Sequence, residues 1–211
     1  MTDKPKGPNE FVSDAYSLKD KESIMAFYRK WADEYDHQMQ SEGYCSPQGV
    51  AELLNEHILH TDLEVLDIGC GTGLTGLHVA NSGITALDGL DLSGEMIKVA
   101  RSRDIYRRLI VADLNQPLTL EDNSYDAVVS SGTFTHGHVG PEPLGEIFRL
   151  LRAGGLLVCT VHFDLWHNKG FDAVFASLMS RGVIKCIALR EGPYYADQDA
   201  EGWFCVYQKC E

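Results

Sequence analysis

The chain has 211 residues and a formal net charge of −13, with 44% hydrophobic and 23% charged residues. This composition is ordinary for a globular protein and predicts one domain with a sizeable core. The acidic balance disfavours nucleic acid and anionic membrane surfaces as partners. The sequence has no run of about 18 apolar residues, so we expect no membrane span. The six cysteines form no Cys-x-x-Cys pair, which favours a reducing, cytoplasmic setting.

The N-terminal part of the chain predicts a tail and two helices. Residues 1–17 are polar, and we expect a flexible tail there. Apolar and aromatic residues recur at three- and four-residue steps from Leu18 to Gln40, which predicts an amphipathic helix. Ser46 and Pro47 predict the start of a second helix, with the serine as its N-cap. We expect residues 18–60 to form a helical cap and residues 63–211 to form the core of the single domain, 18–211.

The stretch from Val65 to Gly73 organises the rest of the chain. Its first four residues predict a strand, its three glycines a tight turn, and Leu74 to Ala80 a helix. Glycine has no Cβ, so a flat ligand can lie against such a turn, and the following helix directs free N–H groups toward it. A dinucleotide fingerprint would need glycine at position 74, where leucine stands.

Strand and helix patterns alternate along the rest of the chain, which is typical of a parallel α/β sheet. Ser93 predicts the cap of a helix, and residues 131–138 predict a loop. Cys159, Cys186 and Cys205 lie in apolar strand patterns and are expected to be small core residues. The predicted strands are 64–68, 85–90, 109–112, 125–130, 156–161, 183–190 and 203–209, and the later helices are 142–152 and 170–181.

The pattern Asp-x-Gly-x-Gly-x-Gly at residues 67–73 resembles motif I of the class I S-adenosylmethionine (AdoMet) methyltransferases. The string from Phe27 to Asp36 resembles the segment that caps their cofactor pocket. The resemblance implies a Rossmann-like sheet of seven strands in the order 3-2-1-4-5-7-6, with the last strand antiparallel, helices on both faces and an N-terminal helical cap. It also implies AdoMet as cofactor, S-adenosylhomocysteine (AdoHcy) as product and a small molecule as methyl acceptor.

Acidic residues at the ends of the second and third strands extend the resemblance to individual positions. Asp91 lies 18 residues past Gly73, close to the offset at which an acid binds ribose hydroxyls. Asp113 matches the position that binds the adenine amino group, although a turn before Asn115 also explains it. Met96 is compatible with a position in the core as well as with a contact to the cofactor. The expected cofactor residues are Tyr28, Tyr35, Asp67, Gly69, Cys70, Gly71, Gly73, Asp91, Leu92, Met96, Ala112, Asp113, Leu114, Ser130 and Ser131.

His136 and His138 follow the fourth strand, where ligands of open α/β sheets bind, and are our catalytic candidates. They fit a general base or a simple pocket wall. A metal site lacks a third ligand at a recognisable spacing, so we expect no metal. The loop is not the Asn-Pro-Pro-Tyr or Asp-Pro-Pro-Tyr of enzymes that methylate adenine or glutamine amino groups. His162, Asp164 and Trp166 follow the fifth strand and are further candidates for the acceptor site.

Two other functions compete with methyl transfer. A domain that binds AdoMet or AdoHcy without turnover is compatible with the lack of an unmistakable catalytic residue. A nicotinamide oxidoreductase is disfavoured by Leu74 and by the lack of a Tyr-x-x-x-Lys pair. The arginines at 101, 103, 107 and 108 form a small basic cluster, which we interpret as a solvated helix face and its exit. The sequence leaves the acceptor and the oligomeric state undetermined.

Overall fold

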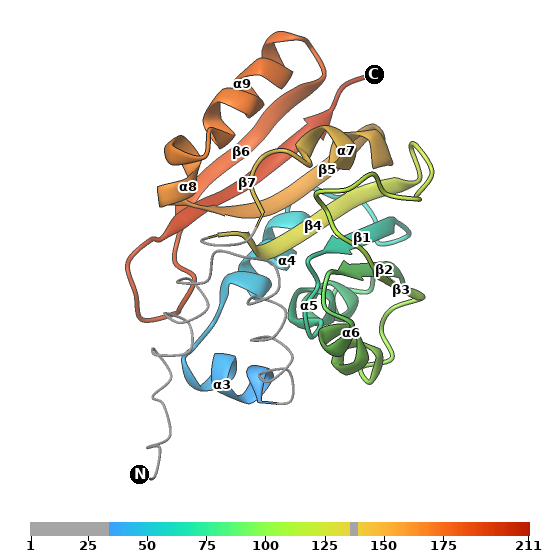
Figure 1. Cartoon of the computed structure of the whole chain (residues 1–211), viewed down its shortest axis with the longest axis vertical. Helices are drawn as coiled ribbons and strands as arrows, with labels where there is room; N and C mark the ends of the chain where they lie inside the picture. The colour runs from blue at the N-terminus through green and yellow to red at the C-terminus, as the bar shows by residue number, and fades with distance from the viewer. Residues whose placement is uncertain (1–33, 136–138) are drawn as a thin grey trace.

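The computed structural model describes residues 34–135 and 139–211, and the structural statements below refer to these residues. Seven strands form one sheet in the order β3-β2-β1-β4-β5-β7-β6 (Figure 1). β1 to β5 are parallel, and β7 runs antiparallel to both of its neighbours. The predicted strand order and antiparallel last strand are confirmed. The strands are β1 (Glu64–Ile68), β2 (Ala86–Asp91), β3 (Arg108–Val111), β4 (Tyr125–Phe134), β5 (Leu151–His162), β6 (Ile184–Gly192) and β7 (Gly202–Lys209).

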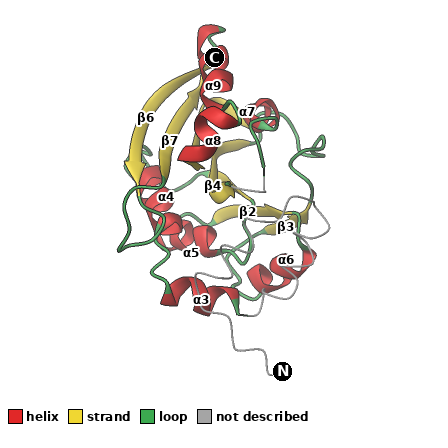
Figure 2. Ribbon diagram, turned by 60° about the vertical axis from the view of Figure 1, so that its left-hand side comes forward, coloured by secondary structure: helices red, strands yellow, loops and turns green. Residues whose placement is uncertain are grey.

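Helices pack on both faces of the sheet because the central strands are apolar on both sides (Figures 1 and 2). In β1, Leu66 joins a core beneath α7, α8 and α9, and Val65 joins a second core beneath α4 and α5. No helix in the described ranges is long and apolar enough to cross a membrane. The helices are α3 (Tyr35–Ser41), α4 (Ser46–Asn55), α5 (Leu74–Asn81), α6 (Gly94–Arg101), α7 (Leu144–Leu150), α8 (Phe163–Asn168) and α9 (Phe171–Ser180).

β4 and β5 are both longer than predicted. β4 continues through Phe134, four residues beyond its predicted end, so the first part of the predicted loop is strand. Phe134 is fully buried and pairs with Val161 across an irregular register, which explains why the strand continues. β5 begins directly after α7 instead of at residue 156. The predicted helix 142–152 therefore ends at Leu150, and Gly154, with a φ of +79°, lies inside β5.

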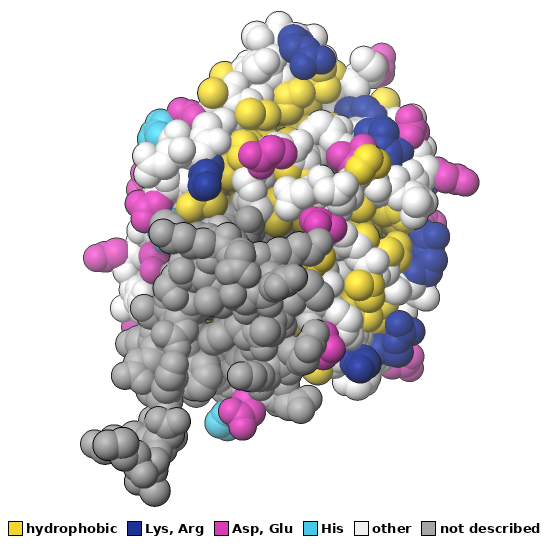
Figure 3. All heavy atoms as spheres, viewed as in Figure 1, with side chains coloured by type: hydrophobic (Ala, Val, Ile, Leu, Met, Phe, Trp, Pro, Cys, Tyr) yellow, Lys and Arg dark blue, Asp and Glu magenta, His cyan; other side chains and the backbone are white. Residues whose placement is uncertain are grey.

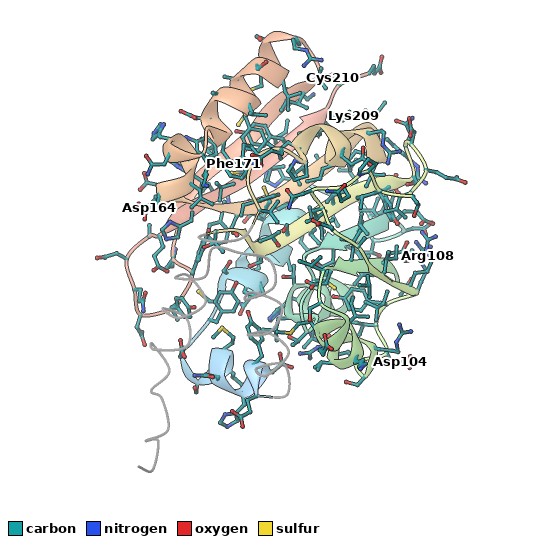
Figure 4. The ribbon with its side chains drawn as sticks, viewed as in Figure 1. Asp104, Arg108, Asp164, Phe171, Lys209 and Cys210 are labelled. Carbon is teal, nitrogen blue, oxygen red and sulfur yellow. The ribbon has the colours of Figure 1, made fainter. Side chains whose placement is uncertain are left out.

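Helices α4 and α8 also differ from the prediction. Ser46 is the first residue of α4 rather than its cap, because Cys45 holds the N-cap position. The Ser46 hydroxyl is 2.6 Å from the Ser131 Oγ, and this contact replaces the expected bond to its own helix. Helix α8 was not predicted, because its six residues are too few to show a period. Phe171, at the start of α9, lies between that helix and the sheet (Figure 4).

The edge of the sheet explains one further error. Cys159 and Cys205 pair across β5 and β7 and are fully buried, as predicted. Cys186, by contrast, is exposed. It lies in β6, the edge strand, where most side chains are accessible. At the far end of β7, Lys209 Nζ donates hydrogen bonds to the Asn123 side chain and to the Leu151 carbonyl (Figure 4).

Candidate cofactor site at the glycine turn

The turn between β1 and α5 has the backbone geometry that its glycines predict. Gly69, Gly71 and Gly73 have φ values of +62°, +54° and +92°, in the left-handed region that side chains disfavour. A Cβ at Gly69 would lie 2.1 Å from the Thr133 Oγ1, so β4 closes one side of the turn. A Cβ at Gly71 would meet no atom of the described residues within 4 Å. In this part of the chain the turn is therefore open at Gly71, where a ligand could lie against the backbone.

Asp91 holds this turn from the end of β2. Its Oδ2 accepts a 2.8 Å hydrogen bond from the Gly71 N–H, and its Oδ1 accepts one of 2.8 Å from the Ser93 N–H. Burial raises the pKa of Asp91, and the backbone hydrogen bonds oppose that rise. Each carboxylate oxygen can accept a second hydrogen bond. Asp91 thus lies within one hydrogen bond of the open turn and keeps the capacity to bind hydroxyl groups.

Asp67, the acid of the glycine motif, is buried beneath the turn. The Tyr106 hydroxyl donates a 2.7 Å hydrogen bond to its Oδ2. Burial raises the pKa of Asp67 to about 7, against the opposing hydrogen bonds from Tyr106 and the Gly76 backbone. Tyr106 was not among the sequence candidates. A Cβ at Gly76 or Gly89 would lie 2.1 Å or 3.0 Å from Tyr106 atoms, so glycines inside a helix and a strand were the available signal.

Helix α3 reaches the turn through polar contacts. The guanidinium of Arg103 forms an ion pair with Asp36, in the first turn of α3. The Nε of Arg103 donates a 2.6 Å hydrogen bond to the Thr72 carbonyl, and the Thr72 hydroxyl donates one of 2.6 Å to the other Asp36 oxygen. Tyr35, directly before Asp36, is half-buried, whereas Tyr28 lies outside the described residues.

The other expected cofactor residues surround the same turn at the ends of β2, β3 and β4. The Ala112 N–H bonds to the Asp91 carbonyl at 2.9 Å, which ties the ends of β3 and β2 together. Asp113 Oδ1 accepts a 3.0 Å bond from the Asn115 N–H, the turn contact that was left open for it. Met96 is 2% exposed and therefore buried. Cys70, Leu114 and Ser130 are also buried, and Leu92 and Ser131 are half-buried.

The carboxyl end of β4 carries a row of hydroxyl groups. Ser130 Oγ donates to the Ile68 carbonyl at 2.9 Å, next to the glycine turn. Ser131 Oγ lies 2.6 Å from the Ser46 Oγ and 3.3 Å from the Tyr44 hydroxyl. Thr135 Oγ1 is buried, with no hydrogen-bond partner among the described residues. His136 and His138, the catalytic candidates, lie outside the described residues.

The candidates after β5 divide between two environments. Trp166 packs against Phe175 and Trp203, with ring centroids 5.8 Å and 5.7 Å apart, and belongs to the core. His162 is half-buried, and its Nδ1 accepts a 3.2 Å hydrogen bond from the Asp164 N–H at the start of α8. Its ring also contacts the ring of Tyr194, with centroids 5.9 Å apart. Only His162 and Asp164 therefore remain near the carboxyl edge of the sheet.

Three arginines of the basic cluster, Arg101, Arg107 and Arg108, are exposed, as the interpretation as a solvated helix face and its exit predicts, and most of the cluster is also bound to carboxylates. Arg107 and Arg108 both form ion pairs with Asp88, which is fully buried in β2. Arg103 binds Asp36, and Arg101 is exposed. On the face shown in Figure 3, Lys and Arg side chains are interspersed with Asp and Glu rather than gathered into one patch. Within the described ranges, no group of three or more His, Cys, Asp or Glu residues is arranged to hold a metal ion.

Comparison with known proteins identifies the family. The model of a family described as "Methyltransferase domain" matches residues 66–159, which include the glycine turn. Human methyltransferase-like protein 27, the Williams–Beuren region protein whose motifs this sequence resembles, is 28% identical over 82% of this chain. Demethylmenaquinone methyltransferase from Tropheryma whipplei is 33% identical over 68% of this chain. The chain spans 72% of the human protein and 61% of the bacterial one.

The fold agrees with these relatives. The crystal structure of a TehB-like S-adenosylmethionine-dependent methyltransferase from Corynebacterium glutamicum superposes with a TM-score of 0.64 and 21% identity. The superposition covers 87% of this chain and 98% of that structure. The strand order and the glycine turn are features of the same architecture. This chain therefore has a methyltransferase-domain sequence match and the fold of the class I AdoMet-dependent methyltransferases.

Proposed function

We propose that this protein transfers the methyl group of AdoMet to a small-molecule acceptor by in-line displacement. The observation that carries the proposal is the open glycine turn, which Asp91 holds through the Gly71 N–H. The open space at Gly71 fits a ligand that lies flat on the backbone, and the half-buried Asp91 beside it fits a ligand with vicinal hydroxyls. When bound, AdoMet supplies a methyl group that its sulfonium already activates.

The residues around the turn suggest how the chain would hold this cofactor. In our proposal Asp91 accepts hydrogen bonds from the ribose hydroxyls, and Asp113 accepts one from the adenine amino group. Tyr35 and Tyr28 cover the ligand with an aromatic ring and offer a hydroxyl to its carboxylate. The other expected cofactor residues surround the ligand at the glycine turn and at the ends of β2, β3 and β4. The task of the protein is then to align the acceptor with the methyl group and to exclude water.

Two observations support a small molecule as the acceptor. The bacterial relative is named for demethylmenaquinone, a small molecule. The segment after β4 also lacks the Pro-Pro-Tyr tetrapeptides of enzymes that methylate adenine or glutamine amino groups. A general base is needed only when the acceptor atom carries a proton, and we propose His136 or His138 for that role. Unchanged turnover at saturating acceptor in both His136→Ala and His138→Ala would remove the base from the proposal.

The test is product formation by the purified full chain. The protein is incubated with AdoMet and a panel of quinone, phenol, amine, thiol and carboxylate acceptors, and AdoHcy and methylated products are measured by mass spectrometry. Acceptor-dependent AdoHcy release at a rate that Asp91→Ala lowers supports the proposal. The alternative, a module that binds AdoMet or AdoHcy without turnover, predicts binding in calorimetry but no acceptor-dependent product. Calorimetry alone does not separate the two.

A further inference from the structure

Three residues from distant parts of the chain form a closed ring of hydrogen bonds beside the glycine turn. Asp36 comes from α3, Thr72 from the turn itself, and Arg103 from the segment after α6. Arg103 bonds to the Thr72 carbonyl through Nε and to Asp36 through a terminal nitrogen. The Thr72 hydroxyl completes the ring by donating to the second Asp36 oxygen. We call these three residues the clasp.

The clasp is partly withdrawn from solvent, so its charge-assisted bonds are screened less than those of a fully exposed pair. The side chain of Arg103 is 17% exposed and that of Asp36 is 37% exposed. Thr72 is 1% exposed. Removing either charge would leave its partner half-buried without a counter-charge, which costs more than losing an exposed surface pair.

Arg103 also fixes the shape of the turn directly. The carbonyl that it binds belongs to the peptide between Thr72 and Gly73, and Gly73 is the N-cap of α5 in a left-handed conformation. A Cβ at Gly73 would lie 3.1 Å from Arg103 Cδ, so the aliphatic part of the arginine packs against the turn. It covers the Gly73 side, whereas no atom of the described segments lies within 4 Å of a Cβ at Gly71.

The same bonds attach α3 to the turn. In the described residues α3 buries one side chain, Met39, so little apolar packing holds the helix. Asp36 directly follows Tyr35, which our proposed function places over the cofactor. The position of that tyrosine therefore depends on the bonds that its neighbour makes. In Figures 1 and 2 α3 lies on the same side of the molecule as α5 and α6, next to the elements that the clasp joins to it.

We propose that Arg103 is a positioning residue for the cofactor, because it fixes the glycine turn and holds α3 in the place where it covers the ligand. This inference rests on the proposed function, since it assumes that AdoMet binds at the turn. It predicts that cofactor binding and the attachment of α3 to the turn are coupled. Cofactor binding then stabilises the attached helix, the attached helix strengthens cofactor binding, and loss of Arg103 removes this coupling.

The experiment measures binding of AdoHcy to the full chain by calorimetry and protease cleavage within residues 35–41. In the wild type we expect AdoHcy to protect this segment. Arg103→Ala and Asp36→Asn should each raise the Kd about tenfold, the order expected for a charge-assisted bond, and should abolish the protection. The double variant should bind AdoHcy with about the same Kd as the single variant that binds less tightly, because each substitution already breaks the same ring of hydrogen bonds. Arg101→Ala, the exposed neighbour, is the matched control and should behave as wild type.

The possible failures are distinguishable. If the wild type binds AdoHcy and Arg103→Ala binds it equally well with protection retained, the inference is wrong and the proposed function stands. If the wild type binds neither AdoMet nor AdoHcy, both fail. Should Arg103→Ala not fold, Thr72→Val serves instead, because it removes only the hydroxyl. We expect it to raise the Kd about threefold, whereas Thr72→Ser should restore affinity. An unchanged Kd in Thr72→Val would overturn the inference.

Discussion

The Tyr106 hydroxyl donates a 2.7 Å hydrogen bond to the buried Oδ2 of Asp67, across 39 residues of sequence. This contact joins the segment between α6 and β3 to the base of the glycine turn. The ring occupies space that Gly76 and Gly89 leave free. The acid of the glycine motif is therefore held from below by a tyrosine, while Asp91 holds the turn from the side.

Tyr106→Phe should destabilise the protein by about 1–3 kcal/mol, the cost of leaving a buried acceptor without its donor. The phenylalanine ring keeps the packing against the two glycines, so the loss reports on the hydroxyl alone. Urea unfolding followed by circular dichroism measures it. Ser102→Ala is a nearby control, because its hydroxyl donates an exposed hydrogen bond to the Val99 carbonyl at the end of α6. Equal midpoints for Tyr106→Phe and wild type would show that the bond contributes nothing.

Asp67 should make the protein less stable as the pH rises from about 4 to about 7. Its pKa is about 7 in the folded protein, above its ordinary 3.8, so in this window the folded state keeps a proton that the unfolded chain has released. The free energy of unfolding then falls with pH, by up to about 1 kcal/mol per unit from this group. Asp67→Asn removes the ionisation. A stability profile of Asp67→Asn parallel to that of wild type would contradict the assignment.

Asp91→Ala should weaken AdoMet binding by about 1–3 kcal/mol, since it removes a charged acceptor from the proposed ribose site. Asp91 also bonds to Gly71, so a lower affinity alone could come from a distorted turn. An AdoHcy analogue without the ribose hydroxyls separates the two causes. We expect it to bind the wild type weakly and to lose no further affinity in Asp91→Ala. A further large loss would place the effect in the turn instead of at the sugar.

Alanine substitutions at three glycines should rank in a fixed order of stability. Gly69→Ala combines a left-handed φ of +62° with a contact of 2.1 Å to Thr133, so it should lose the most, about 3 kcal/mol or more. Gly71→Ala has the strained φ but open space, and should lose about 1 kcal/mol. Gly94→Ala, in α6 with open space and no positive φ, should be neutral or gain up to about 1 kcal/mol. Thermal unfolding gives the ranking, and a stable Gly69→Ala would contradict the close packing of β4.

Asp88→Ala should cost about 2 kcal/mol of stability, because it leaves the hydroxyl of Tyr125 and two guanidinium groups without their shared acceptor. Burial raises the pKa of Asp88, but hydrogen bonds from Arg108 and Tyr125 and the arginine charges hold it below its ordinary value. Its contribution is therefore present above the ordinary pKa of 3.8 and is lost as the pH falls through the folded value. Chemical unfolding at neutral pH and at about pH 3 checks this, and an equal loss in Asp88→Ala at both pH values would contradict it.

The features that the sequence predicted depend on local patterns. The left-handed glycines at 69, 71 and 73 follow from residue type alone, and Ser93 caps α6 through a bond to the Met96 N–H, as its position predicts. The strands themselves follow from their own apolar runs, whereas the strand order came from the family resemblance. The glycine turn, the cap and the apolar runs need no knowledge of which distant residues meet.

The features that were missed depend on contacts between distant segments. Arg103 and Tyr106 lie in a short irregular segment, and no period indicates that both reach the glycine turn. Ser46 has the sequence of a cap, but Ser131 lies close enough to take its hydroxyl. The exposure of Cys186 depends on β6 being the sheet edge, which its own alternation does not reveal.

The placement of β7 between β5 and β6 has a consequence for synthesis of the chain. β6 pairs only with β7 in the described sheet, so it has no partner while β7 is still inside the ribosome. During that interval its backbone and the side chains of Ile187 and Leu189, which stay 40% and 39% exposed even in the finished fold, face the solvent uncovered. Before β7 emerges, the unpaired edge of β6 is therefore a site where a chaperone can bind and where the strand can pair wrongly.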